Sequence, residues 1–216
     1  MITIILTSTV NVNFNKCYLY QINANNRLET YLKSINQWLT KTNFNIILVE
    51  NSGYEFNELN AEKETYKHRF EVITFNEQSL PEAGYLINNN SKGASEFFSI
   101  DYVYRHSKIL HLSKFVIKIT GRFFIDELEN YLMNFNLDNY NCLTQHDRDR
   151  CEMVGSHYNN FLDIFNTSLY INGRYTGHVE DIWKVRTSRC ENVLVCKEFT
   201  IEETQRGGMN EKYTTI

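Results

Sequence analysis

The chain has almost no proline and no long apolar run. Pro81 is the only proline among 216 residues, which argues against long structured linkers. No apolar stretch approaches the roughly 20 residues that a membrane-spanning helix needs. The N-terminal MITIILTSTVNVNF has neither a basic segment nor a small-residue cleavage site, so we expect no signal peptide. These absences predict a single domain over residues 1–216 with no membrane span.

Excess positive charge and paired cysteines are also lacking. The formal net charge is −4 with a sequence pI near 5.9, which argues against nucleic acid as a partner and leaves anion binding to local cations. The cysteines are odd in number and form no CxxC pair: Cys17, Cys142, Cys151, Cys190 and Cys196. We therefore expect reduced thiols, a cytoplasmic location and no structural zinc.

Strand-like and helix-like segments alternate along the chain, which favours an α/β fold. Buried strands are predicted from the β-branched and apolar runs at 2–10, 44–54, 70–75 and 114–119. Helical spacing of apolar residues predicts helices over 25–39, 91–110 and 124–135. Beyond them we expect a strand at 139–145, short helices at 158–165 and 179–189, and a last strand at 191–201. Strand–helix–strand order implies parallel pairing.

Polar residues follow several of these strands. Ligands of open α/β sheets bind beyond the carboxyl ends of the strands, so we expect a polar ligand there. The residues concerned are Thr7, Ser8 and Thr9; Glu50, Asn51 and Ser52; and Lys118, Thr120, Gly121 and Arg122. Lysine and arginine both suit phosphate oxygens, although solvated cations at a strand exit would look the same.

Two further segments combine charge with helix starts. In KGASE, Lys92, Gly93 and Glu96 open a helix that Ser91 or Ser95 would cap, an arrangement that suits either an anion site or a plain capped helix. In VEDIWKVR, Glu180 and Asp181 follow a glycine-bracketed loop. A carboxylate there could be a general base, or it could only complement the helix dipole.

A literal DxD lies in the segment TQHDRDRCE. Asp147 and Asp149 could present two carboxylates to Mn²⁺ or Mg²⁺, because alternate residues of an extended chain share a face. Arg148 and Arg150 interleave with them, which is also typical of a solvated, salt-bridged loop.

Taken in order, these segments resemble a glycosyltransferase of the GT-A (Rossmann-like) type. The strand with hydroxyls, ENSGY, KGASE, FVIKITGRFFI and the glycine loop before VEDIWKVR carry the likeness. The block 92–125 is similar to small transferases of surface-polysaccharide pathways with a K-x-TGR strand end. The compact size and the Asn-, Ile- and Lys-rich composition would suit an enzyme of a large DNA virus, in the host cytoplasm.

The resemblance implies a central mixed, mostly parallel sheet flanked by helices. It assigns residues 1–125 to nucleotide-sugar binding and 126–216 to acceptor binding. Residues at the ends of the first two strands would hold the nucleoside, and the TGR turn stands where most GT-A enzymes carry a metal-binding DxD. We therefore expect Lys118 and Arg122 to stabilise the diphosphate in place of a metal, with Asp147 and Asp149 as an alternative metal site.

The resemblance also implies the reaction. It predicts transfer of a sugar from a nucleotide-sugar donor to a glycan or glycoconjugate acceptor. Inversion is expected, with Asp181 or else Glu180 taking the acceptor proton. Two alternatives stay open: a non-catalytic nucleotide- or sugar-binding module on this scaffold, and a nucleotidyltransferase.

Overall fold

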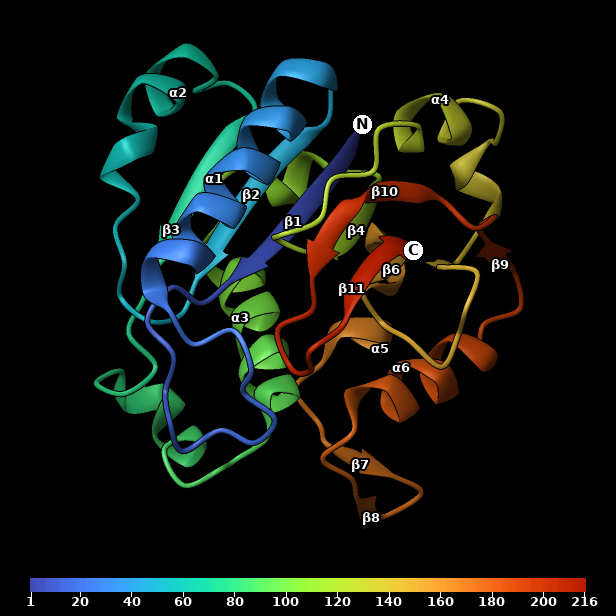
Figure 1. The fold of residues 1–216 in the computed structure, drawn as a ribbon. Helices are drawn as coiled ribbons and strands as arrows, with labels where there is room; N and C mark the ends of the chain where they lie inside the picture. Colours follow the sequence, from blue (N-terminus) through green and yellow to red (C-terminus); the bar gives the residue numbers. More distant parts are fainter.

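The computed structural model describes residues 1–216 as a seven-stranded sheet with helices on both faces (Figure 1). The sheet comprises β1 (Ile2–Ser8), β2 (Asn45–Glu50), β3 (Phe70–Thr74), β4 (Phe115–Thr120), β5 (Cys142–Thr144), β6 (Met153–His157) and β9 (Val193–Val195), in the order β3-β2-β1-β4-β6-β5-β9. β6 runs antiparallel to both its neighbours, and the other pairs are parallel. The predicted mixed, mostly parallel sheet is confirmed.

The helices divide between the two faces. They are α1 (Ala24–Lys41), α2 (Asn60–Thr65), α3 (Lys92–His106), α4 (Leu128–Leu132), α5 (Phe161–Phe165) and α6 (Val179–Ser188). α1 and α4 contribute to one apolar cluster, and α3, α5 and α6 contribute to the other. None of the helices is long and apolar enough to cross a membrane.

Side-chain alternation along the buried strands separates the two clusters. In β1, Ile4 and Leu6 face α1, whereas Ile5 faces α3. Such near-continuous apolar runs are expected of strands that are covered on both sides. In β4, Ile117 and Ile119 lie on the α1 face, which leaves Lys118 on the opposite, α3 face.

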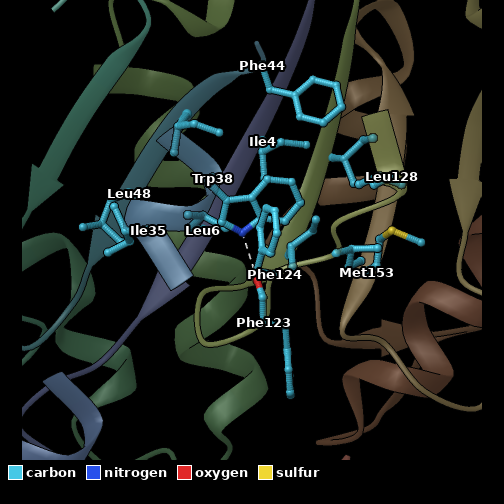
Figure 2. Close-up of a cluster of buried hydrophobic side chains, with 14 of the residues drawn as sticks. Ile4, Leu6, Ile35, Trp38, Phe44, Leu48, Phe123, Phe124, Leu128 and Met153 are labelled. Atoms are coloured by element: carbon cyan, nitrogen blue, oxygen red, sulfur yellow. Dashed lines mark hydrogen bonds between the residues drawn. The ribbon is translucent and has the colours of Figure 1, made fainter. Parts of the chain in front are cut away.

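The core on the α1 side also fixes the turn after β4. Figure 2 shows Trp38 of α1 packed among Ile4, Leu6 and Phe124, with its indole N–H donating to the carbonyl of Phe123 at 2.9 Å. Ser34 donates to the same carbonyl at 3.0 Å. The chain leaving β4 is therefore tied to α1 immediately beyond Arg122.

Two hairpins and the central strand β6 (Met153–His157) were not predicted. The hairpins are β7 (Tyr170–Ile171) with β8 (Arg174–Tyr175), and β10 (Thr200–Gln205) with β11 (Lys212–Thr215). The predicted strand at 191–201 divides instead into β9 and the start of β10. The helix predicted at 124–135 shortens to α4. The β10–β11 hairpin lies on the same side of the sheet as α1 (Figure 1).

Candidate functional site

A cleft of about 1070 Å³ opens beyond the carboxyl ends of β1, β2 and β4. These ends lie side by side, because Thr7 pairs with Val49 on one side and with Thr120 on the other. The starts of α3 and α6, the loop after β1 and the tip of the β10–β11 hairpin complete the walls. The predicted site residues that line it are Thr7, Ser8, Thr9, Asn51, Ser52, Lys92, Gly93, Glu96, Thr120, Arg122 and Glu180.

The ends of β1 and β2 form a connected polar rim. Thr9 donates through its hydroxyl to Asn51 Oδ1 at 2.6 Å, and Asn51 Nδ2 donates to Glu77 at 3.2 Å. The backbone N–H of Asn11 donates to the hydroxyl of Ser52 at 3.0 Å. These bonds hold hydroxyl and amide groups at fixed positions along one wall of the cleft.

Glu50 supports this rim from below and does not line the cleft. Its side chain is fully buried and accepts hydrogen bonds from the backbone N–H groups of Val10, Ser52 and Tyr54 at 2.8–2.9 Å. Burial raises the pKa of the carboxyl, and the hydrogen bonds partly offset that rise. Glu50 thus organises the two loops, and a direct contact with a nucleoside would need them to open.

The Thr120–Gly121–Arg122 turn packs directly on the end of β1. The N–H of Gly121 donates to the Thr7 carbonyl at 2.9 Å, and a Cβ at this position would lie only 2.7 Å from that oxygen. Glycine is required for this approach. The turn consequently carries Thr120 and Arg122 to the cleft wall, while Gly121 itself does not line it.

Lys118 does not reach the cleft. Its side chain is buried on the α3 face, where Nζ forms an ion pair with Glu96 at 2.7 Å and donates to the Cys151 carbonyl at 2.8 Å. The ring of Trp183 lies 4.8 Å from the ammonium. Burial lowers the pKa of Lys118, but Glu96 together with Cys151 and Glu152 outweighs it, and the net shift is upward. This charge is satisfied inside the protein.

The start of α3 is capped and tightly packed. Ser91 accepts a hydrogen bond from the Ala94 N–H at 3.3 Å, so Ser91 rather than Ser95 is the cap. Gly93 faces Val179 at the start of α6, and a Cβ on Gly93 would lie 2.0 Å from Val179 Cγ1. The missing side chain lets the two helix starts meet at the cleft, with Lys92 beside them.

The two acidic residues at the start of α6 point differently. Glu180 is half-buried and lines the cleft. Asp181 is exposed and lies outside the lining. Glu180 forms no ion pair within 4 Å, although its charge is close enough to raise the pKa of Lys92 slightly against the larger lowering effects.

Asp147 and Asp149 lie in an exposed loop away from the cleft lining. The Asp147 carboxylate accepts a hydrogen bond from the backbone N–H of Asp149 at 2.9 Å, and Asp149 pairs with Lys184 of α6. The interleaved arginines turn inward: Arg148 donates to Thr187 at 3.0 Å. The DxD spacing here is that of a salt-bridged loop.

Several cleft residues were missed by the sequence reasoning. Arg27 and Tyr31 lie on the buried face of α1, and an arginine at helical spacing from the apolar residues Tyr31 and Trp38 is unusual enough to have indicated the site. Arg206, Gly207 and Gly208 come from the hairpin tip, whose Gly-Gly pair marks a turn. Lys16 pairs with Glu77 at 2.8 Å between two loops, which no local pattern could reveal.

Four carboxylates line the cleft, and three of them are paired with cations. Glu77 pairs with Lys16, Glu96 with Lys118, and Glu152 with Arg150, at 2.7–3.2 Å. Only Glu180 is left over. Nowhere in the chain do three or more His, Cys, Asp or Glu side chains come together as a metal-ligand group.

Comparison with protein-family models and with curated protein sequences finds no match. Solved structures do match. The glycosyltransferase GlyE of Streptococcus pneumoniae TIGR4 superposes with a TM-score of 0.53 at 8% identity, over 90% of this chain and 44% of that chain. A Desulfovibrio desulfuricans G20 protein assigned as a nucleotide-diphospho-sugar transferase gives 0.50 at 13% identity, over 91% of this chain and 79% of that chain.

TarS 1–349 of S. aureus also gives 0.50, at 9% identity, over 90% of this chain and 57% of that chain. The chain thus spans roughly half the length of GlyE and of TarS 1–349. Identities this low bear on architecture alone. The predicted GT-A type fold is confirmed: the chain has a central mixed, mostly parallel sheet flanked by helices, and it matches these solved structures over about nine tenths of its length.

Proposed function

We propose that this protein transfers a sugar from a nucleotide-sugar donor to a hydroxyl group of a glycan or glycoconjugate acceptor. The observation that carries the proposal is the cleft itself. It lies on a GT-A type fold at the carboxyl ends of β1, β2 and β4, and it brings a hydroxyl- and amide-rich wall, several cations and an unpaired Glu180 together.

The polar rim formed by Thr9, Asn51 and Ser52 is the proposed nucleoside wall. Its groups are already connected to one another, so a base or ribose would meet fixed donors and acceptors. The diphosphate would then extend towards Lys92 and Arg122, at the start of α3 and the end of β4. Residues 1–125 thereby provide most of the donor site, and 126–216 provide the side that faces the acceptor.

Glu180 is the proposed general base, because it faces the cleft and Asp181 does not. In an inverting transfer the acceptor oxygen attacks C1 of the sugar and gives its proton to the Glu180 carboxylate. The bond between C1 and the phosphate oxygen breaks on the opposite face. The electron pair leaves with the nucleoside diphosphate.

The experiment that tests the proposal is a donor screen. The protein is incubated with UDP-, GDP- and dTDP-sugars, and both slow donor hydrolysis and thermal stabilisation by nucleoside diphosphates are measured. We expect one base to stabilise the protein and its sugar conjugate to be hydrolysed. Binding without turnover would identify a non-catalytic module, and the absence of both would refute the proposal.

Two neighbouring substitutions assign the base. Glu180→Gln should reduce turnover by about 10²- to 10⁴-fold, the range that general bases contribute, with donor binding retained. Asp181→Asn, one residue away on the exposed side of α6, should leave turnover within about twofold. The opposite pattern would return the role to Asp181. The anomeric configuration of the product, read by NMR, tests inversion.

A further inference from the structure

Three cations in the cleft have no carboxylate partner. Arg27 donates to the carbonyls of Thr9 and Gln21 and to the Tyr31 hydroxyl, all of them uncharged. Lys92 donates to the Tyr18 carbonyl at 2.6 Å. Arg122 has one long hydrogen bond, from Nη1 to the Gln205 carbonyl at 3.4 Å. The other cleft cations, Lys16 and Arg206, pair with Glu77 and Glu211.

These cations influence one another. The pKa of Lys92 is lowered, first by burial and then by the positive charges of Arg122, Arg27 and Arg206, against a smaller opposing effect of the Glu180 carboxylate. The pKa of Arg27 is lowered as well, mainly by burial, with Arg122 adding to the effect. Like charges gathered in a partly desolvated cleft destabilise the free protein, and a bound anion would relieve that repulsion.

Arg122 has an unused donor. Its Nε is buried and has no hydrogen-bond partner, although unpartnered buried donors are uncommon and costly. The guanidinium lines the cleft at the end of β4, so an anion in the cleft could accept hydrogen bonds from the guanidinium.

The tip of the β10–β11 hairpin rests on the same cations. A Cβ at Gly207 would lie 2.4 Å from Arg122 Nη1, and one at Gly208 would lie 2.8 Å from Lys92 Nζ. The two glycines therefore let the hairpin approach both cations, and Arg206 of the tip joins them in the cleft. The hairpin tip therefore packs directly against the cation cluster.

The cleft does not fit a divalent metal. Of its four carboxylates three are paired with Lys16, Lys118 and Arg150, and the turn after β4 carries Thr120 and Arg122 instead of acids. Mg²⁺ and Mn²⁺ require several oxygen ligands, usually including one or two free carboxylates.

We propose that Arg27, Lys92, Arg122 and Arg206 form a metal-independent site for the diphosphate of the donor. The inference rests on the proposed glycosyl transfer and names what stabilises its leaving group. When the C1–oxygen bond breaks, negative charge accumulates on the departing phosphate oxygen. The four cations neutralise it in place, which is the task of a metal ion in DxD-bearing enzymes.

The test measures binding of inorganic pyrophosphate by calorimetry in the presence of EDTA. The intact protein should bind pyrophosphate, and added salt should weaken the binding. Arg122→Gln should weaken it by about 10- to 100-fold, the range for a lost charge-assisted hydrogen bond, and Lys92→Met should also weaken it. Arg122→Lys keeps the charge but loses the fork, so its loss should be smaller.

Matched controls are available outside the cleft. Arg105→Gln removes an arginine from the far end of α3, and Lys33→Met removes an exposed lysine of α1. Both should bind pyrophosphate like the unmodified protein. Gly207→Ala displaces the Arg122 guanidinium without changing the charge, and it should also weaken binding.

The outcomes separate this inference from the proposed function. Pyrophosphate binding or donor turnover that requires Mn²⁺ would overturn the metal-independent site while leaving glycosyl transfer intact. Equal weakening by Arg122→Gln and Arg105→Gln would overturn the residue assignment. Cation-dependent pyrophosphate binding in EDTA without turnover of any nucleotide-sugar would support the anion site and refute the enzyme activity instead.

Discussion

The buried pair between Lys118 and Glu96 offers a sharp test of the structure. The Lys118 side chain is 1% exposed and the Glu96 side chain is 19% exposed, so the two residues depend on each other unequally. Glu96→Gln removes the compensating charge, so the Lys118 ammonium group stays in the core with uncharged partners such as the Cys151 carbonyl and the Thr120 hydroxyl. Breaking a buried ion pair in this way costs about 3–5 kcal/mol of stability.

The reverse substitution should cost less. Lys118→Met keeps most of the apolar stem and removes the charge, whereas Glu96 retains some solvent and the Thr7 hydroxyl at 2.8 Å. The unpaired Cys151 carbonyl then sets the loss at about 1–3 kcal/mol. In the double variant no buried charge remains, so it should be at least as stable as Glu96→Gln alone.

Urea unfolding followed by tryptophan fluorescence measures all four free energies, and Trp183 lies beside the ammonium. Losses that simply add in the double variant would refute the pairing. The pH dependence gives a second check. Because the pKa of Lys118 is raised above its ordinary 10.5, its contribution is complete below that pH and is lost as the pH rises through the folded-state value. The difference in free energy of unfolding between the unmodified protein and Lys118→Met should therefore shrink in strongly alkaline solution.

Two further predictions concern packing and access to the cleft. Gly93→Ala should destabilise the protein by about 1–3 kcal/mol, because the new Cβ meets Val179, whereas Gly84→Ala, with no atom within 4 Å, should not; equal urea midpoints would contradict the close contact of α3 with α6. Cys17 is exposed and lines the cleft, whereas burial raises the pKa of the thiols of Cys151 and, to about 12, of Cys196. A thiol reagent should therefore modify Cys17 first, and a bound nucleoside diphosphate should slow that reaction; modification unaffected by a ligand that stabilises the protein would place the ligand elsewhere.

The fold was predictable because its central strands are buried on both faces. Runs such as those of β1, β2 and β4 stand out without any knowledge of their partners. β6 was missed because Met153–His157 contains a glycine and two polar residues. Gly155 sits there for a tertiary reason: a Cβ would lie 2.9 Å from the ring of Phe115 on the neighbouring strand. A local pattern contains no trace of that neighbour.

The site was predictable in outline for the same reason. Strand ends cluster wherever strands are parallel, so the polar residues after β1, β2 and β4 were expected to meet, and they do. Which of them face the cleft depends on alternation and on distant partners. Side chains alternate along β4, and Ile117 and Ile119 face α1. Lys118 between them therefore points to α3, where Glu96 neutralises its charge. Arg206 comes from a hairpin whose docking no local signal records.

The ion pairs of the cleft explain why it holds more unpaired cations than unpaired carboxylates. Three of its carboxylates pair with Lys16, Lys118 and Arg150, and the first two of these pairs connect segments that are far apart in the sequence. These three cations thus neutralise carboxylates that would otherwise repel an anionic ligand. What remains is a group of cations around Arg122 and one free acid, Glu180, on the start of α6. An excess of cations favours a leaving diphosphate, and a single free carboxylate suffices to accept a proton, so the same cleft would meet both requirements of the proposed glycosyl transfer.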